Sequence, residues 1–525
     1  MSLLTKNFAK VYSAQTTFLS AKIIDIEVDL SKGLHSFTIV GLPDKAVEES
    51  RDRVSAAIKN SGFKSPKSKN QKIIISLAPA DIKKEGPVFD IGIALAYLLA
   101  SDEIKFDPKE KLFLGELSLD GELRGINGIL PIVIEAKKRG FTEVFLPKVN
   151  VDEGALIDGI KVFGANNLRE VICHLNEKLE ERKLIERSKR TKIKNKKENY
   201  TIDFEDIKGQ ETAKRGLEIA AAGGHNIAMF GPPGTGKTML AKAFCHILPE
   251  LSFEDALEVT AIHSIAGLLN VPLMTNPPFR TPHHTASHVA LVGGGAVPKP
   301  GEITLAHRGV LFLDEFPEFE RRVIEALRQP LEDMIINISR AKGSVSFPAN
   351  FILIAAMNPC QCGNFGSARR CVCAPSAFER YKRKISGPII DRIDMWIEVS
   401  NIPHDKLLEN DSKDKENKKN KESEKMKKNI LRARAIQKQR FKNTKRKIKT
   451  NSEMNGKDIN HFINLPDNAQ KILNNAARSM DLSPRAYHRV LKLSRTIADL
   501  SGSETVEENH ILEALQYRPK QIQEL

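Results

Sequence analysis

The chain has 525 residues, of which 41% are hydrophobic, and this content is enough for several ordinary cores. Its 81 basic and 66 acidic residues give a net charge of +15, which suits a polyanionic partner, although a solvated lysine-rich surface gives the same balance. The sequence has no apolar run long enough to span a bilayer and no signal-peptide core, so we expect a cytoplasmic protein with no membrane partner. Six cysteines in so long a chain do not make a disulfide framework.

Residues 1–175 alternate short apolar runs with turn signals and should form a separate domain that mixes helices and strands. The spacing of their apolar side chains predicts strands at residues 23–28, 36–40 and 72–77, helices at 44–58 and 90–100, and a hairpin at 115–121.

Two runs in this domain resemble the proteolytic domain of the Lon family: KEGPVFDIGIALA at residues 84–96 and GELSLDGELRGINGIL at residues 115–130. The resemblance implies a Lon-protease-like α+β domain without the chemistry. Val88 stands directly after Gly-Pro, where that family has its nucleophilic serine, and the position of the partner lysine falls on or near Leu130. Since acyl transfer needs a nucleophile and a base, we expect an inactive domain kept for binding or assembly.

The stretch 176–200 is almost wholly charged and ends in a basic run. We expect a helix that trails into a flexible linker, with a nucleic-acid contact from Arg187 to Lys197 as the alternative. A core domain at residues 201–402 follows, and its leading helix should span residues 211–222.

The sequence GPPGTGKT lies between an apolar run at 225–230, which predicts a buried strand, and residues 239–244, which predict a helix. Glycines let backbone N–H groups surround an anion, and the helix N-terminus adds its dipole. The pattern predicts a site for ATP and Mg²⁺, in which Lys237 reaches the β- and γ-phosphates and Thr238 holds the metal. The cofactor-binding residues are Gly231, Pro232, Pro233, Gly234, Thr235, Gly236, Lys237, Thr238 and Met239.

Two further apolar runs predict strands that end in polar side chains. Residues 309–313 lead to Asp314, which can hold Mg²⁺ through water, and Glu315, which can polarise the attacking water. Residues 351–357 lead to Asn358, whose amide suits a sensor of the γ-phosphate. The alternatives are a solvated acidic turn and a turn-forming asparagine before a proline.

The long interval between the phosphate loop and the acidic pair is dense in glycine and proline at residues 279–302, which predicts hairpins or exposed loops. His283 and His284 in this interval are candidates for a contact with DNA or a metal, or for hydrogen bonds that hold the loop in place.

Four cysteines gather after Asn358 as two Cys-x-Cys pairs, and their thiolates suit a structural Zn²⁺, with reduced loop thiols as the alternative. The four are Cys360, Cys362, Cys371 and Cys373. Cys173 and Cys245 lie alone in apolar settings and should be packing residues.

Two arginines are candidates for reading the γ-phosphate. Arg392 comes just before an apolar strand and could reach the nucleotide of a neighbouring subunit, which requires an oligomer. A salt bridge with Asp391 or Asp394 is the alternative. Arg485 lies in the first turn of a helix with a serine N-cap and an initial proline, and from there it could reach the bound nucleotide.

Residues 403–455 are densely charged. The first part is poor in apolar residues and should be disordered or a bare helix. The second part predicts a basic helix whose Arg432, Arg434, Arg440 and Lys442 could meet phosphates or face solvent. Residues 456–525 are helical in pattern.

Together with GPPGTGKT, the runs FRTPHHTASHVALVGGGAVPKPGEITLAHRGVLFLDE, AAMNPCQCG, GPIIDRIDM and SPRAYHRVLKLSRTIADL resemble the magnesium-chelatase-like AAA+ family of the ComM/YifB type. The likeness covers nearly the whole chain. It implies an AAA+ P-loop α/β core with an inserted pore-facing hairpin, a C-terminal α-helical lid, and an ATP-driven hexameric ring. It also implies movement on single-stranded or branched DNA, as in a branch-migration helicase. The alternatives are a magnesium chelatase motor subunit, which inserts Mg²⁺ into a porphyrin, and an ATP-gated scaffold or chaperone.

Overall fold

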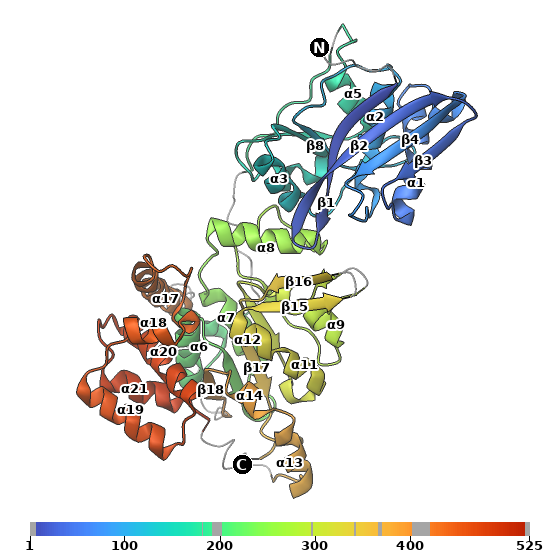
Figure 1. The fold of residues 1–525 in the computed structure, drawn as a ribbon. Helices are drawn as coiled ribbons and strands as arrows, with labels where there is room; N and C mark the ends of the chain where they lie inside the picture. The colour runs from blue at the N-terminus through green and yellow to red at the C-terminus, as the bar shows by residue number, and fades with distance from the viewer. Residues whose placement is uncertain are drawn as a thin grey trace, which may run out of the picture. The chain divides into compact units, whose positions relative to one another are not determined.

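The computed structural model describes residues 7–180, 182–191, 202–295, 298–340, 343–365, 370–401 and 421–519 (Figure 1). These residues divide into two compact units. The first comprises residues 1–195 and 256–274, and the second comprises residues 196–255 and 275–525.

The first unit is built on a seven-stranded sheet in the order β3-β4-β2-β1-β5-β8-β9. β2 pairs antiparallel with both β1 and β4, whereas the pairs β3–β4, β1–β5, β5–β8 and β8–β9 are parallel. The strands are β1 (Phe8–Thr17), β2 (Ser20–Lys32), β3 (Ser36–Val40), β4 (Gln71–Ala78), β5 (Lys111–Phe113), β8 (Glu143–Pro147) and β9 (Lys161–Ala165), with a small hairpin of β6 (Glu116–Leu117) and β7 (Leu123–Arg124).

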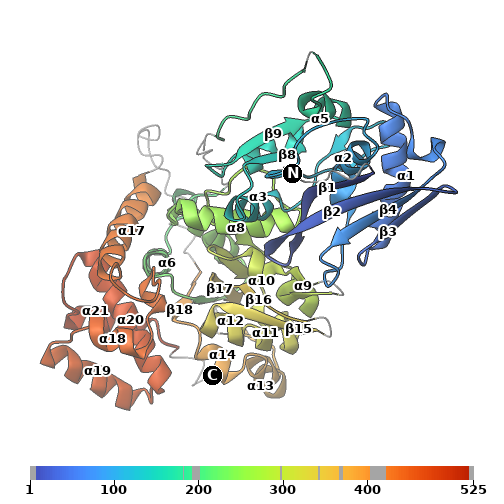
Figure 2. The same cartoon turned by 45° about the horizontal axis from the view of Figure 1, so that its top comes forward.

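Neighbouring residues of a strand point to opposite faces of a sheet. In the parallel part of this sheet both faces are apolar and are covered by helices. On β5, Phe113 packs into the core that contains α1 and α2, and Leu112 packs into the core beneath α3. Figure 2 shows α1 and α2 on the same side of β1 to β4. The helices are α1 (Lys45–Asn60), α2 (Asp90–Ala100), α3 (Ile129–Lys138), α4 (Val151–Gly154) and α5 (Leu168–Leu175), with 3₁₀ turns η1 (Pro66–Ser68), η2 (Pro87–Phe89) and η3 (Lys148–Asn150).

A segment from the middle of the chain, residues 256–274, belongs to this first unit. It contains most of α8 (Phe253–Ile265). Ser264 accepts a hydrogen bond from the Gly128 backbone N–H at 2.9 Å and donates one to the buried Glu153 carboxylate at 2.5 Å. The boundaries drawn from the sequence did not separate this segment from the residues on either side of it.

The helix expected after residue 176 is absent from the described residues 176–180 and 182–191, which form turns and extended chain. One isolated bridge joins Phe163 and Arg187. A short run of charged side chains has no apolar face to bury, so packing does not stabilise a helix here. Most of the expected basic contact, from residue 192 onward, lies outside the described residues.

The second unit contains a five-stranded parallel sheet in the order β11-β14-β17-β10-β18. The strand that precedes the phosphate loop, β10, lies between β17 and β18, where the order of the chain reverses. The strands are β10 (Ile227–Phe230), β11 (Phe279–Arg280), β14 (Val310–Leu313), β17 (Ile352–Met357) and β18 (Met395–Glu398).

Two hairpins branch from this unit. One joins β12 (Gly293–Gly294) and β13 (Lys299–Pro300) within the glycine-rich interval, and the other joins β15 (Ile335–Arg340) and β16 (Gly343–Pro348). The second hairpin was not expected from the sequence. The helices are α6 (Glu211–Gly223), α7 (Lys237–Ile247), α9 (His288–Val292), α10 (Glu302–Leu305), α11 (Arg321–Ala326), α12 (Arg328–Asp333), α13 (Pro375–Arg383) and α14 (Gly387–Ile390), with η4 (Phe204–Asp206) and η5 (Phe316–Glu318).

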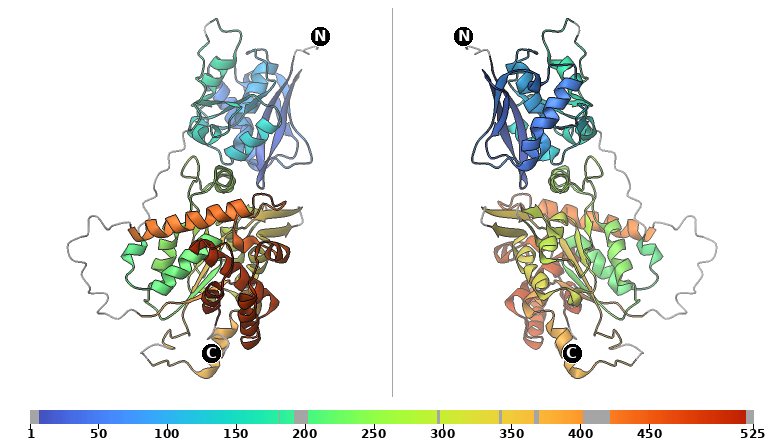
Figure 3. Two further views of the ribbon diagram at one scale, coloured as in Figure 1. Left: turned by 90° about the vertical axis from the view of Figure 1, so that its left-hand side faces the viewer. Right: turned by 90° about the vertical axis from the view of Figure 1, so that its right-hand side faces the viewer.

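The C-terminal part of this unit is helical and shares a hydrophobic core with α6 and α7. Figure 3 shows the long helix α17, in orange, running beside the green helices of the core. The elements are α17 (Lys421–Arg440), η6 (Asn451–Glu453), α18 (Gly456–Phe462), α19 (Asp467–Ser479), α20 (Pro484–Ser501) and α21 (Glu508–Gln516). The part of the charged segment at residues 402–420 lies outside the described residues.

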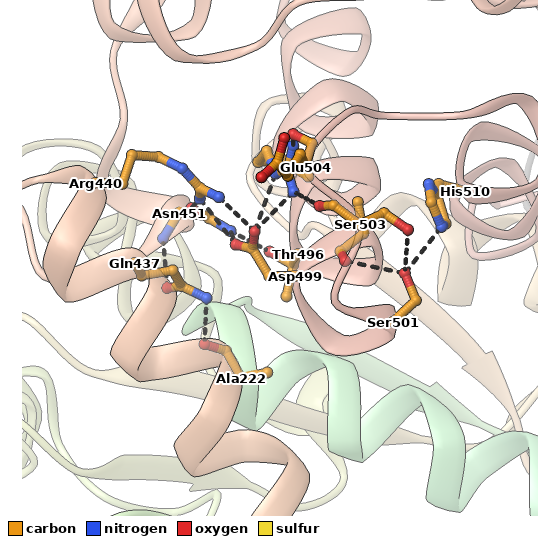
Figure 4. A network of polar contacts seen from close by, with 12 residues as sticks. Ala222, Gln437, Arg440, Asn451, Thr496, Asp499, Ser501, Ser503, Glu504 and His510 are labelled. Carbon is orange, nitrogen blue, oxygen red and sulfur yellow. Dashed lines mark hydrogen bonds and ion pairs between the residues drawn. The ribbon is translucent and has the colours of Figure 1, made fainter.

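The expectation that Arg434 and Arg440 of this helix contact phosphates is wrong. Arg434 donates to the Ala221 carbonyl at 2.7 Å. Arg440 pairs with the buried carboxylate of Asp499, to which Asn451 also donates at 2.8 Å (Figure 4). Both guanidinium groups are therefore used inside the protein, whereas Arg432 and Lys442 are exposed.

The parallel α/β core and the helical C-terminal region agree with the expected AAA+ class. The likeness of the first unit to the Lon protease fold stays a prediction. Among the described residues, no helix has the length and apolar composition that crossing a membrane requires.

Candidate nucleotide-binding site

The candidate site lies at the carboxyl edge of the parallel sheet, where ligands bind in open α/β folds. The neighbouring strands β10, β14 and β17 run in the same direction. The residues that follow them are the phosphate loop after Phe230, Asp314 after Leu313, and Asn358 after Met357. Three stretches that are far apart in the sequence therefore meet at one edge.

The phosphate loop needs its glycines for two different reasons. Gly234 and Gly236 have φ of +80° and +90°, a left-handed conformation that side chains disfavour. Gly231 instead lies so close to β18 that a Cβ there would come within 2.1 Å of the Val399 carbonyl oxygen. The loop then runs into α7, which begins at Lys237 and directs its N-terminal N–H groups toward the loop.

Lys237 is buried and its ammonium group lies within the loop. Its Nζ donates to the carbonyls of Gly231 at 2.7 Å and Pro232 at 2.9 Å, and to Asn358 Oδ1 at 3.2 Å. Burial lowers the pKa of Lys237 to about 8, against the opposing effect of the Asp314 charge. The lysine is thus held by neutral acceptors that a phosphate group could replace.

Hard oxygen atoms suited to Mg²⁺ come together beside this lysine. Thr238 Oγ1 donates to Asp314 Oδ2 at 2.8 Å, so the hydroxyl and the carboxylate face one another. The other oxygen of Asp314 accepts from the Glu315 backbone N–H at 3.0 Å. These donors fit the expected magnesium site.

Glu315 has φ of +51°, and its partly exposed carboxylate lies 3.1 Å from Nδ1 of His284. The ring centroid of His284 is 4.2 Å from that of His283. His284 was one of two histidines singled out from the sequence, but its pairing with Glu315 was not foreseen. The interval between α8 and β14 thus supplies a direct contact to the candidate catalytic carboxylate.

Arg392 and Arg485 pair with an acidic residue that lies outside the phosphate loop of their own chain. Both bind the carboxylate of Glu332 on α12, Arg485 through Nη2 at 3.0 Å and Arg392 through its own Nη2. Arg392 therefore pairs with neither Asp391 nor Asp394, and Asp394 pairs with Arg489 instead. The two candidate arginines border a shared cavity of about 310 Å³.

The structure also brings the four clustered cysteines together, with all four Sγ atoms within 4.8 Å of one another, so this group can bind a metal ion. Cys245 is buried, as expected for a packing residue, and Cys173 is partly buried.

Two residues beside these sites were not identified from the sequence. Tyr381 donates to the Asn358 carbonyl at 3.0 Å from α13, and Glu332 joins the two arginines. An acidic residue or a tyrosine on a short helix carries no local signal of such a contact.

Three family models match the chain in succession. They are described as "Subunit ChlI of Mg-chelatase" at residues 26–150, "Magnesium chelatase, subunit ChlI" at residues 203–407, and "Magnesium chelatase, subunit ChlI C-terminal" at residues 420–518. The first match lies in the first unit, and the third includes α17.

Similar proteins extend the match to nearly the full length. The chain is 43% identical to the competence protein ComM of Haemophilus influenzae, covering 98% of this chain and 97% of the relative. It is 42% identical to the uncharacterised protein YifB of Escherichia coli, over 97% of this chain and 96% of that protein. A shorter match, 34% identical over 17% of this chain and 21% of the relative, is to the DNA repair protein RadA of Streptococcus pneumoniae. The chain therefore belongs to the magnesium-chelatase-like family that contains ComM and YifB.

Proposed function

We propose that this protein is a magnesium-dependent ATPase that couples ATP hydrolysis to movement on DNA as a hexameric ring. The observation that carries the ATPase proposal is the meeting of Lys237, Thr238, Asp314 and Asn358 at one edge of the parallel sheet. A glycine-rich turn that served only structure would not require an ammonium group, a metal-binding carboxylate and an amide at this edge.

Each of these side chains has a separate task in the proposed reaction. Lys237 would exchange its carbonyl partners for phosphate oxygens. Thr238 and Asp314 would hold Mg²⁺, and the ion would supply positive charge beside the phosphates. Asn358 would place its side-chain amide beside the γ-phosphate, because its Oδ1 already accepts a hydrogen bond from Lys237.

The ion that best suits the four clustered cysteines is a structural Zn²⁺.

Glu315 is the proposed general base. Its carboxylate accepts a proton from water as that water attacks the γ-phosphate, and it must be free to point at the phosphate. The contact with His284 holds the carboxylate elsewhere until it is released. A base restrained in this way would limit futile hydrolysis.

The placement of Arg392 and Arg485 supports an oligomer. Both arginines gather on Glu332 rather than on the phosphate loop of their own chain, so we propose that both serve the nucleotide of a neighbouring subunit. Arg485 was expected to read its own nucleotide, and its position beside Arg392 favours the neighbour instead.

The proposed DNA partner is supported by the net charge of +15 and by the presence of a competence protein and a DNA repair protein among the similar proteins. The magnesium chelatase subunit remains the second candidate, because all three family models carry that description. An ATPase stimulated by porphyrin and indifferent to DNA would favour this second candidate.

The test is the steady-state ATPase rate of the full chain alone and with single-stranded, duplex or forked DNA, at low and high salt. We expect stimulation by DNA that weakens as salt rises, since phosphate contacts release counterions. Glu315→Gln should bind ATP normally and lose turnover by about 10²-fold or more. The matched control is Glu318→Gln, which removes a nearby carboxylate that pairs with Lys384 and should keep the rate. Equal rates with and without every DNA would refute the movement on DNA.

A further inference from the structure

The four clustered cysteines lie close enough together to bind one metal ion, because all four Sγ atoms are within 4.8 Å of one another. A zinc ion with Zn–S bonds near 2.3 Å places its four sulfur atoms about 3.8 Å apart. Here the Sγ of Cys360 lies 3.4 Å from that of Cys362 and 3.8 Å from that of Cys371, and Cys362 and Cys371 are 3.6 Å apart. These three sulfurs are thus near the spacing of zinc ligands and not at the roughly 2.05 Å of a disulfide.

The surrounding chain is shaped to present these sulfur atoms. Cys360 is fully buried and its sulfur accepts from the Phe365 backbone N–H at 3.3 Å. Such a hydrogen bond to a ligand is a common feature of metal sites, because it orients the sulfur and offsets its charge. Gly363, with φ of +79°, lets the loop turn back between the two halves of the cluster.

The same loop lies directly against the nucleotide site. It begins two residues after Asn358 and ends in α13, from which Tyr381 donates back to the Asn358 carbonyl. Gly363 packs against the phosphate loop so closely that a Cβ there would lie 2.7 Å from Cδ of Pro233. The loop therefore braces both the candidate γ-phosphate sensor and the loop that holds the phosphates.

The described part of residues 359–374 contains no helix and no strand, and only Cys360 and Gly363 in it are buried. A segment with so little apolar burial is not fixed by packing, whereas a bound metal can fix it.

We propose that Cys360, Cys362, Cys371 and Cys373 bind one Zn²⁺, which holds this loop against Asn358 and the phosphate loop. Zinc binding stands on the cysteines alone, and the effect on ATP turnover rests on the proposed function. Zinc serves here as a structural ion with four protein ligands and no open position for a substrate.

The first experiment measures zinc in the full chain by elemental analysis after purification and dialysis. We expect about one Zn²⁺ per chain in the wild type and less than about 0.1 in the double variant Cys371→Ser/Cys373→Ser, since two of four ligands are lost. The matched control, Cys173→Ser, removes a cysteine outside the cluster and should keep its zinc. Replacement of zinc by Co²⁺ should give the visible absorption of tetrahedral cobalt thiolates in the wild type and in the control. A wild type without zinc, or a double variant that retains it, would overturn the site.

The second experiment separates the metal site from its effect on the nucleotide. Tyr381→Phe keeps all four ligands and removes only the hydrogen bond from α13 to the Asn358 carbonyl, so it should retain zinc while ATP turnover falls about fivefold. Zinc-loaded Tyr381→Phe with wild-type turnover would refute the bracing role while leaving the site intact. A wild type that holds zinc but hydrolyses no ATP under any condition would instead refute the proposed function.

Discussion

Raising the pH should weaken ATP binding through Lys237. Burial lowers the pKa of this lysine to about 8 from an ordinary value of 10.5. Phosphate oxygens favour the charged form, so the lysine in the complex stays protonated. ATP binding must then take up a proton at any pH above about 8, and the affinity falls as the pH rises through that value.

The size of the effect follows from the fraction of free protein that carries the proton. With a pKa of about 8 that fraction is near nine-tenths at pH 7 and near one-tenth at pH 9, so the affinity should fall about tenfold over this range. A lysine with the ordinary pKa of 10.5 would change the affinity by less than about 1.1-fold over the same range.

Calorimetric titration of the full chain with ATP and Mg²⁺ checks this prediction. Titrations in buffers of different ionisation enthalpy should show uptake of about 0.9 proton per ATP at pH 9. Lys237→Met should bind weakly and without this pH dependence, whereas Lys242→Met, an exposed lysine on the same helix, should keep the wild-type dependence. An affinity that changes less than about twofold between pH 7 and pH 9, or an equal slope in Lys237→Met, would refute the reasoning.

Two further changes test contacts in the second unit. Glu332→Gln removes the charge that holds Arg392 and Arg485, so the basal ATPase rate should rise about two- to fivefold, and a lower rate would mean that Glu332 positions the arginines instead of restraining them. Asp499→Asn leaves the Arg440 guanidinium without its buried carboxylate and should lower the free energy of unfolding by about 3–5 kcal/mol, as measured by urea denaturation. A loss below about 1 kcal/mol would contradict a buried ion pair at this position.

The meeting of the candidate site residues was predictable because its signals are local. Lys237 and Thr238 belong to one contiguous motif, and each of Asp314 and Asn358 directly follows an apolar strand. The carboxyl ends of neighbouring parallel strands meet at one edge, so residues in these positions approach each other whatever the length of chain between them. The hydrogen bonds of Thr238 to Asp314 and of Lys237 to Asn358 follow from that rule.

The shared partner of Arg392 and Arg485 was not predictable, because no local signal in the sequence indicates it. Glu332 and Arg485 are 153 residues apart, and nothing in the spacing of either residue indicates the other. The segment 256–274 presents the same difficulty, because its place in the first unit depends on contacts such as that between Ser264 and Glu153. Such contacts depend on tertiary packing that no local pattern contains.

The basic helix α17 shows why net charge is a weak guide to a DNA surface. Ile430 and Ala433 lie three residues apart on this helix and so share one face, and both are fully buried. Arg434 lies at the edge of that buried face and must find a partner inside the protein, as it does at the Ala221 carbonyl. A long cationic side chain beside an apolar stripe is thus buried together with the stripe, and its charge cannot contact a phosphate group outside the protein. A surface for the proposed DNA partner has to be sought among exposed residues such as Arg432. On that proposal, Arg432→Ala should reduce the salt dependence of DNA binding, whereas Arg434→Ala should act through stability.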